Sequence, residues 1–325
     1  MLKKTMLAAT VALMPFVAAA QQVDPGLPGY KPVSGVSGNV KSIGSDTLNN
    51  LMTLWAEGFR SHYPSVKIEI EGKGSSTAPP ALIAGTSQFG PMSRPMKAAE
   101  VDQFEKKFGY KPAAIRTSLD ALAVFVHKDN PIQCLTLQQI DAIFSKTRKG
   151  GHAKDIAAWG DVGLSGEWAA KPISLYGRNS ASGTYGYFKE EALFNGDYRD
   201  SVKEQPGSST VVQAVASDKF AIGYSGVGYK TADVRTVPIA AKPGAPCYDA
   251  NAENAYSGNY PIARFLYVYL NKNPNQTLDP VRSELIRFVF SKEGQQVVVK
   301  DGYFPVTKKI AEEDLSRLGI KAAGS

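Results

Sequence analysis

A polar turn rich in hydroxyl groups lies near the middle of the chain, between a predicted strand at residues 172–176 and a predicted helix at residues 188–194. The turn reads Arg178-Asn179-Ser180-Ala181-Ser182-Gly183-Thr184. Its hydroxyl groups stand at the helix start, where the first backbone N–H groups have no intrahelical acceptor and the helix dipole is positive. Such a helix start binds small anions. Arg178 adds a charged, planar set of donors that suits an oxyanion.

Two interpretations of this turn are open when it is taken alone. One is an ordinary Ser/Thr N-cap with a surface arginine beside it, because such caps are common. The other is an anion site, and three further turns favour it because they also carry hydroxyl groups beside predicted strands and helices. These turns are Ser45-Asp46-Thr47 after a strand at 40–44, Gly72–Thr77 after a strand at 66–70, and Gln88–Pro95, which contains Ser93 and Arg94.

The four turns together indicate one kind of chemistry. They supply many hydroxyl and N–H donors and two arginines, but no histidine and no pair of carboxylates. This set of groups predicts a site for a small tetrahedral oxyanion held by hydrogen bonds, without a catalytic base. The three histidines, His62, His127 and His152, lack the spacing of metal ligands, so we expect neither a metal nor a cofactor.

The elements that must position these turns alternate between strands and helices, which predicts an α/β fold with largely parallel sheets. Residues 120–127 and 264–270 are long apolar strands, of the kind buried on both faces. Apolar residues at helical spacing follow the turn at residues 45–47. Further helices are predicted at 98–108, 137–144, 211–217, 280–290 and 291–299, and residues 253–259 are predicted to form a loop.

Composition and charge narrow the function classes. The chain has 325 residues, 43% of them hydrophobic, which is enough for two domains with sizeable cores. The formal charge is +7, and it falls to +5 when Lys3 and Lys4 are removed with an N-terminal leader. No basic run is interleaved with aromatic residues, which argues against a nucleic-acid partner. A mild positive charge attracts anionic ligands.

Residues 1–20 have the pattern of a secretory signal peptide. Lys3 and Lys4 precede an apolar run, and Ala18-Ala19-Ala20 forms a small-residue cleavage site. No later segment is long and apolar enough to span a membrane, so we expect an exported, soluble protein in the periplasm or outside the cell. Cys134 and Cys247 either form a disulfide or remain separate thiols, and the sequence leaves both alternatives open.

The four turns, in their order and spacing, resemble those of the periplasmic phosphate-binding proteins of bacterial ABC phosphate importers, the PstS family, and most closely its pseudomonad-type branch. The resemblance covers nearly all of the mature chain. It implies a two-lobed type II periplasmic-binding-protein fold with two mixed sheets and a double-strand hinge near residues 121–127 and 264–270. The implied lobes are residues 21–118 with 264–325, and residues 119–263.

The resemblance also implies the ligand contacts. Thr47 and Ser75 would each bind phosphate through a hydroxyl and a backbone N–H, and Leu48 would contribute its N–H. Arg178 would pair with the anion, and Ser182, Gly183 and Thr184 would donate from the helix start. Arg94 has two interpretations on charge grounds: a phosphate ligand, or a surface arginine that holds its turn.

The chain departs from the best-known members at two positions. Ser93 stands where they have an Asp that accepts the proton of bound phosphate, and Ser180 stands where they have a second acid. We hypothesise that Asp46 takes over the acceptor role; the alternative is that Asp46 caps the helix that begins at Leu48. Ser45, Ser93 and Ser180 complete the set of candidate ligands.

These observations predict a non-enzymatic protein that binds inorganic phosphate tightly as a monomer and delivers it to a membrane permease. Three alternatives stay open. A secreted phosphatase would use Ser75 or Ser182 as nucleophile, but the sequence shows no activating base, metal cluster or Gly-x-Ser-x-Gly motif. An adhesion protein has no specific support. The same fold could instead bind sulfate, molybdate or an organic phosphate.

Overall fold

The computed structural model describes residues 22–322. Its strands are β1 (Asn39–Gly44), β2 (Lys67–Gly72), β3 (Gly90–Met92), β4 (Ala113–His127), β5 (Leu135–Thr136), β6 (Ser174–Arg178), β7 (Lys203–Gln205), β8 (Ala221–Gly226), β9 (Val234–Thr236), β10 (Ile239–Ala240), β11 (Ala263–Leu270) and β12 (Phe304–Pro305). Its α-helices are α1 (Asn49–His62), α2 (Ala78–Ala84), α3 (Ala98–Phe108), α4 (Leu137–Phe144), α5 (Gly183–Glu191), α6 (Ser208–Ser217), α7 (Ala252–Tyr256), α8 (Pro280–Val289), α9 (Lys292–Lys300) and α10 (Lys308–Leu318). The short 3₁₀ helices are η1 (Asp46–Leu48), η2 (Ser75–Thr77), η3 (Trp159–Val162), η4 (Gly166–Trp168) and η5 (Val227–Tyr229).

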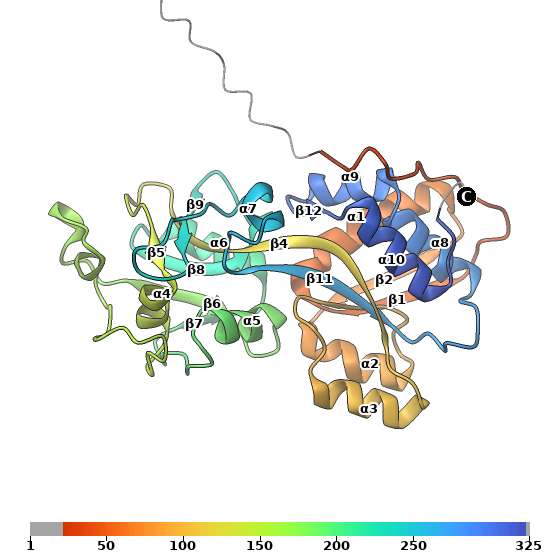
Figure 1. Ribbon diagram of the computed structural model, residues 1–325, viewed down its shortest axis with the longest axis horizontal. Coiled ribbons are helices and arrows are strands. Elements are labelled where there is room, and N and C mark those ends of the chain that lie inside the picture. Colours follow the sequence, from red (N-terminus) through yellow and green to blue (C-terminus); the bar gives the residue numbers. More distant parts are fainter. Residues whose placement is uncertain (1–21, 323–325) are drawn as a thin grey trace, which may run out of the picture.

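The molecule is elongated and has two lobes joined by long strands (Figure 1). We call the part with β1–β3, α1–α3 and α8–α10 the first lobe, and the part with α4–α7 and β6–β8 the second lobe. The chain enters the second lobe through β4 and returns through β11, and these two strands run side by side between the lobes. The two-lobed α/β fold expected from the sequence is confirmed. The expectation of largely parallel sheets is wrong, because β4 and β11 run between the lobes in opposite directions and β4 also pairs antiparallel with β8, β9 and β12. Parallel pairing joins β1 to β2 and β6 to β7 and β8.

A single strand carries the main sheet from one lobe to the other. The main sheet has eight strands, in the order β3-β11-β4-β8-β6-β7, with β9 and β12 also paired to β4. Residues 113–121 of β4 pair with β11, whereas residues 122–126 pair with β8. The partner of β4 therefore changes at residues 121–122. The predicted strand at 120–127 was too short, because its polar first half, from Ala113, pairs with β11.

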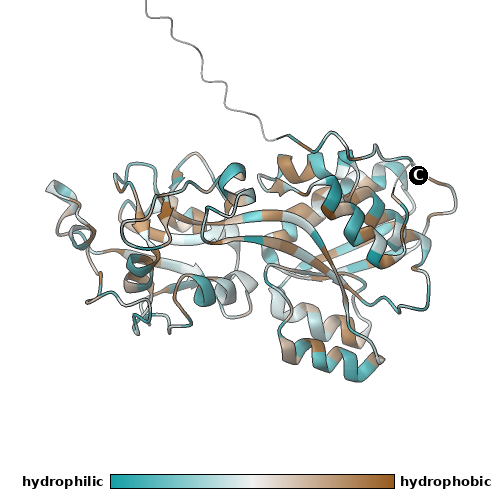
Figure 2. Ribbon diagram, viewed as in Figure 1, coloured by the Kyte–Doolittle hydropathy of each residue, from teal (hydrophilic) through white to brown (hydrophobic). Residues whose placement is uncertain are grey.

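The apolar pattern of the sequence explains how the lobes pack. Residues 121–126 of β4 have no exposed surface, so they form the centre of the core that the lobes share. In the first lobe, the apolar stripe of α1 packs against α8 and α9, and the Trp55 indole Nε1 donates to the Gly294 carbonyl at 2.8 Å. Figure 2 shows hydrophobic residues along the central strands and hydrophilic residues on the outer helices.

An aromatic stack fixes α5 against the second-lobe sheet. The Phe188 ring lies parallel to the Tyr224 ring, with centroids 3.9 Å apart. The Tyr224 hydroxyl donates to Tyr198 and receives the N–H of Arg178 at 3.3 Å. This contact joins the end of β6 to β8, so it fixes the place where the central polar turn leaves the sheet.

Several helix predictions are confirmed, α8 and α9 within one residue at each end, and larger differences occur at α5, α6 and α7. Helices α3 and α4 have the predicted bounds. Helix α5 begins at Gly183 rather than residue 188, because the Ser182 hydroxyl accepts the Thr184 N–H, and it ends before Phe194, whose φ of 51° is left-handed. Helix α6 begins three residues before the predicted 211. Residues 252–256 form α7 instead of a loop, because Asn251 caps them by accepting the Asn254 N–H at 2.9 Å.

The two cysteines are paired in the second lobe, so the alternative of separate thiols is wrong. Cys134 and Cys247 form a disulfide that spans 113 residues of sequence. Cys134 precedes β5, and Tyr248, the neighbour of Cys247, pairs with Ile239 of β10. The disulfide therefore joins the segments that hold the small β5–β10 sheet of the second lobe.

None of the helices among residues 22–322 is long and apolar enough to cross a membrane. The predicted signal peptide at residues 1–20 lies outside the described residues, so it stays a prediction.

Candidate functional site

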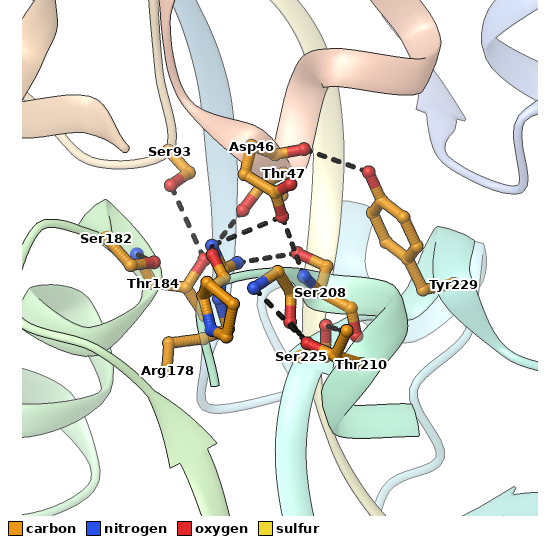
Figure 3. A network of polar contacts seen from close by, with 12 residues as sticks. Asp46, Thr47, Ser93, Arg178, Ser182, Thr184, Ser208, Thr210, Ser225 and Tyr229 are labelled. Atoms are coloured by element: carbon orange, nitrogen blue, oxygen red, sulfur yellow. Dashed lines mark hydrogen bonds and ion pairs between the residues drawn. The ribbon is translucent and has the colours of Figure 1, made fainter. Parts of the chain in front are cut away.

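Turns from both lobes meet between them (Figure 3). The hydroxyl of Thr47, in η1 of the first lobe, lies 2.9 Å from the hydroxyl of Thr184, in α5 of the second lobe. The Thr184 hydroxyl also lies 3.4 Å from that of Ser93, which follows β3. All three side chains are buried. Three of the four polar turns predicted from the sequence are therefore in contact.

The fourth turn joins the same cluster through Ser75. The N–H of Ser93 donates to the Ser75 hydroxyl at 3.0 Å, and the two hydroxyl oxygens are 3.3 Å apart. Gly183 faces this pair so closely that a Cβ there would lie 2.3 Å from the Ser75 Oγ. Only glycine permits this approach of the α5 start to the first lobe.

Backbone donors converge on the same place. Thr47 and Leu48 lie in the turn that leads into α1, Ser75 begins the turn that leads into α2, and Gly183 begins α5. The first N–H groups of a helix have no intrahelical acceptor. The Ser45 N–H is already used, because it donates to the Pro91 carbonyl at 2.7 Å and so fixes η1 beside β3.

Arg178 ends β6 and is almost fully buried beside these turns. Its Nη1 donates to the Ser208 hydroxyl at 2.6 Å and its Nη2 to the Pro206 carbonyl at 3.0 Å. Its Nε is buried and has no acceptor within residues 22–322. Burial lowers the pKa of the guanidinium, and the nearby Asp46 carboxylate opposes that shift. A buried cation with an unused donor suits an anion.

Asp46 reaches across to the second lobe and does not cap α1. Its Oδ1 accepts the Ser208 N–H at 2.7 Å and lies 3.2 Å from the Arg178 Nη2. The residue at the N-cap of η1 is Ser45, and no side chain caps α1. The capping alternative for Asp46 is therefore wrong, because its carboxylate binds groups of the opposite lobe.

Two tyrosines hold η1 from outside. The Tyr229 hydroxyl donates to the Asp46 carbonyl at 2.9 Å, and the Tyr303 hydroxyl donates to the Thr47 carbonyl at 3.0 Å. Burial raises the pKa of both hydroxyls, so both stay protonated and keep donating. These bonds fix the position of η1 beside the cluster.

Arg264, on β11, was not predicted as a site residue. Its Nη2 donates to the Thr184 hydroxyl at 2.8 Å and its Nη1 to the Ser93 carbonyl at 2.7 Å. The Nε and Nη2 also contact the buried Asp120 Oδ2, at 3.0 and 2.9 Å. The guanidinium therefore contacts two of the hydroxyl-bearing turns, those of Ser93 and Thr184.

Four hydroxyl groups of the site each accept a hydrogen bond from a donor that is fixed in position. Ser75 accepts from the Ser93 N–H, Ser182 from the Thr184 N–H, Thr184 from Arg264 and Ser208 from Arg178. A hydroxyl has one proton, so each of these groups, with a lone pair engaged by a fixed donor, can direct its proton elsewhere. The arrangement suits a ligand that only accepts hydrogen bonds.

Two candidates lie apart from the cluster. The Arg94 guanidinium forms paired hydrogen bonds with Glu100, at 2.8 and 2.7 Å, and these side chains line a groove of about 710 Å³ that Ser182 also lines. Ser180 is exposed in the same groove. The structure does not bring either side chain into contact with the four hydroxyls, so their roles as ligands stay predictions.

Ser208, Arg264 and Asp120 were not predicted as site residues, although the sequence contains weak indications of each. Ser208 belongs to a fifth hydroxyl turn, Pro206-Gly207-Ser208-Ser209-Thr210, which lies between β7 and α6 as the other turns lie between strands and helices. Arg264 and Asp120 are charged residues at the ends of the two apolar strands. They lie directly opposite each other across β4 and β11, a pairing that depends on the register of the sheet.

A two-lobed α/β fold with converging helix starts between the lobes defines the class of periplasmic solute-binding proteins. A model of the PBP superfamily domain matches residues 31–293. Among solved structures, a phosphate ABC transporter substrate-binding protein from Clostridium perfringens with bound phosphate has a TM-score of 0.69 and 26% identity, and the match covers 83% of this chain and 100% of that one. A phosphate-binding protein from Planctomyces limnophilus has a TM-score of 0.63 and 27% identity, covering 88% of this chain and 99% of that one.

Sequence relatives identify the family within this class of solute-binding proteins. The phosphate-binding protein PstS of Pseudomonas aeruginosa is 58% identical over 316 residues, which is 97% of each chain. PstS of Staphylococcus epidermidis is 28% identical over 87% of this chain and 83% of its own. The chain belongs to the PstS family.

Proposed function

We propose that this protein binds inorganic phosphate in the periplasm and delivers it to the membrane permease of an ABC importer. The observation that carries the proposal is that the Ser75, Ser182, Thr184 and Ser208 hydroxyls each accept a hydrogen bond from a fixed donor, which leaves the hydroxyl proton able to point to a ligand. An acceptor-rich tetrahedral anion between the lobes satisfies all four. The names of the PstS relatives support phosphate as that anion.

The phosphate ligands are the residues whose donors meet in this cluster. They are Thr47, Leu48, Ser75, Arg178, Ser182, Gly183 and Thr184, with Ser208 added from the structure. Backbone N–H groups and Arg178 make charge-assisted hydrogen bonds, which are the strong ones.

Asp46 is the acceptor for the proton that phosphate keeps near neutral pH. Both contacts of its carboxylate with the second lobe reach Oδ1. Oδ2 is left to accept a proton from the ligand. Sulfate has no such proton, so it would leave a carboxylate oxygen unpaired beside a like charge. This arrangement would favour phosphate over sulfate without an acid at Ser93.

Ligand binding closes the lobes, because the donors belong to both of them. We place the lobes at residues 21–118 with 264–325 and at residues 119–263. The change of β4 partner at residues 121–122 supports a hinge there. The closed surface is then what the permease recognises, and the binding protein acts as a monomer.

The protein is a solute-binding component and not an enzyme. The hydroxyls of Ser75 and Ser182 accept backbone N–H groups, and within residues 22–322 neither contacts a histidine or carboxylate that could activate it as a nucleophile. Nothing in the geometry favours a phosphatase.

Isothermal titration of refolded, ligand-free protein with phosphate and with sulfate tests the proposal. We expect tight one-to-one binding of phosphate and much weaker binding of sulfate. Equal affinities would contradict the role of Asp46, and the absence of phosphate binding would overturn the function itself. Sedimentation of the liganded protein checks the monomer.

A further inference from the structure

We propose that Arg264 is a positioning residue for the ligand: it holds the Thr184 hydroxyl as a hydrogen-bond donor and links the closed lobes to the anion site. This inference rests on the proposed function and assigns a role to a residue outside the set of direct ligands. Arg264 reaches the site from the strands that join the lobes, whereas the proposed ligands lie in the polar turns or at the ends of the elements that these turns connect.

The position of Arg264 is set by a buried ion pair at the hinge. Arg264 and Asp120 are cross-strand partners on β11 and β4, next to the residues where β4 changes its partner. The Asp120 Oδ2 accepts from Nε and Nη2 of Arg264, while its Oδ1 accepts the Val227 N–H at 2.9 Å. The Tyr187 ring covers the guanidinium, 5.3 Å from its centroid. The side chain is therefore held on two sides.

The remaining donors of Arg264 contact both lobes. Nη1 reaches the Ser93 carbonyl in the first lobe, and Nη2 reaches the Thr184 hydroxyl in the second. A rigid, planar guanidinium can make both bonds only when the two turns lie at this separation. The contacts thus depend on closure of the lobes, as the ligand contacts do.

The chemistry of the guanidinium gives the Thr184 hydroxyl a direction. Arginine has no acceptor, so the bond to Thr184 must use an oxygen lone pair of the threonine. The single proton of Thr184 then points to Thr47, Ser93 or a ligand oxygen. Without this donor, the hydroxyl could turn and present a lone pair to the anion, which would repel it. Arg264 therefore favours ligands that accept at this point.

A double-mutant cycle on the full-length mature protein tests this role. Arg264→Lys keeps the positive charge beside Asp120, but a single ammonium cannot reproduce the planar set of bonds to Asp120, Ser93 and Thr184. Thr184→Val removes the hydroxyl, and Thr184→Ser keeps it. Affinity for inorganic phosphate is measured by calorimetry for the wild type, for each single variant, and for Arg264→Lys combined with each Thr184 variant.

We expect Arg264→Lys to weaken phosphate binding about tenfold, the loss typical of one hydrogen bond to a charged group. In the Thr184→Val background the same change should weaken binding less than threefold, whereas in the Thr184→Ser background the loss should return. A purely structural role would give the same loss in every background, because it does not act through the hydroxyl.

Arg116→Lys is the matched control. Arg116 lies on β4, as Asp120 does, and it also pairs with a buried aspartate, Asp314 of α10. This pair is in the first lobe, away from the anion site. Arg116→Lys should leave phosphate affinity unaltered.

Equal losses in all backgrounds, or no loss for Arg264→Lys, would overturn the proposal while leaving phosphate binding intact. A wild type that fails to bind phosphate would overturn both. If Arg264→Lys does not fold, Arg264→Gln, which retains an amide donor, replaces it in the cycle.

Discussion

The Oδ1 of Asp46 lies 3.2 Å from the Nη2 of Arg178, and this contact joins the first lobe to the second. Arg178 is almost completely buried, so its positive charge is stabilised by the few polar groups around it and not by water. The Ser208 N–H reaches the same carboxylate oxygen at 2.7 Å. Asp46 therefore offsets the charge of the buried Arg178 and is itself held in one orientation by the opposite lobe.

Replacing Asp46 with asparagine separates its two roles. Asp46→Asn keeps an oxygen that can accept from Ser208 and Arg178, but it turns Oδ2 into a donor and removes the negative charge. We expect phosphate affinity to fall about tenfold to a hundredfold, as for a lost hydrogen bond to a charged group, and sulfate affinity to rise. Calorimetry with both anions measures the change in selectivity.

The exposed Asp102 on α3 supplies the control for this experiment. Asp102→Asn removes the same charge from the protein far from the cluster, so both affinities should stay as in the wild type. An unchanged ratio of phosphate to sulfate affinity in Asp46→Asn would contradict the acceptor role.

Gly183 should be needed for the lobes to close. In Gly183→Ala, the added Cβ would lie 2.3 Å from the Ser75 Oγ and 2.7 Å from the Ser93 Oγ, both on the opposite lobe. Its backbone is ordinary helix, so the variant should fold, but closure should be blocked and phosphate affinity should drop more than tenfold. Small-angle scattering at saturating phosphate should give a larger radius of gyration than the wild type.

Gly186 is the matched control, on the same helix and the same side of the molecule. A Cβ at Gly186 would lie 3.6 Å from the Arg94 side chain, an ordinary contact. Gly186→Ala should bind phosphate and close like the wild type. Normal closure of Gly183→Ala would show that the α5 start does not limit the approach of the lobes.

Ser208 should support Arg178. In Ser208→Ala, the Arg178 Nη1 loses its acceptor at 2.6 Å and a second donor of a buried guanidinium is left unpaired. We expect phosphate affinity to fall about tenfold and the free energy of unfolding to fall by about 1–3 kcal/mol. Chemical denaturation and calorimetry measure the two quantities.

The adjacent Ser209 is exposed at the same helix start, so Ser209→Ala is the control. It should change neither the free energy of unfolding nor phosphate affinity. If both alanine variants behave like the wild type, Ser208 does not hold the arginine, and the proposed donor set loses its member from α6.

The contributions of Ser208 and Arg264 also show where sequence reasoning ends. Thr47, Ser75 and Thr184 could be predicted, because each stands where a strand turns into a helix, and that pattern is local. Arg264 acts through a cross-strand register and a second lobe, neither of which is encoded in neighbouring residues. The orientation of Asp46 likewise depends on α6, which lies far along the chain, so a helix cap was an equally good interpretation of the sequence.

The disulfide between Cys134 and Cys247 should stabilise the second lobe without taking part in binding. It closes a loop with a sequence separation of 113 residues, and for loops of that length the chain-entropy model gives about 4–5 kcal/mol. Replacing both cysteines with serine should lower the melting temperature and leave phosphate affinity unchanged. Equal melting temperatures of the variant and the oxidised wild type would contradict the stabilising role.

The stability of the protein should depend on pH through Asp301, at the end of α9. Its Oδ1 accepts from Asn50, its Oδ2 is buried without a partner within residues 22–322, and burial raises the pKa of the carboxyl from 3.8 to about 6. The folded state therefore binds this proton more tightly than the unfolded state, and the corresponding stability is present at low pH and lost as the pH rises through 6. Asp301→Asn keeps the acceptor for Asn50 and removes the charge, so it should raise the free energy of unfolding at about pH 8 by up to about 3 kcal/mol, and at about pH 5 by about half as much. Denaturant unfolding of both proteins at the two pH values measures the difference, with Asp102→Asn as a control that should change neither value. A gain that does not shrink towards low pH would mean that Asp301 does not titrate as its burial requires.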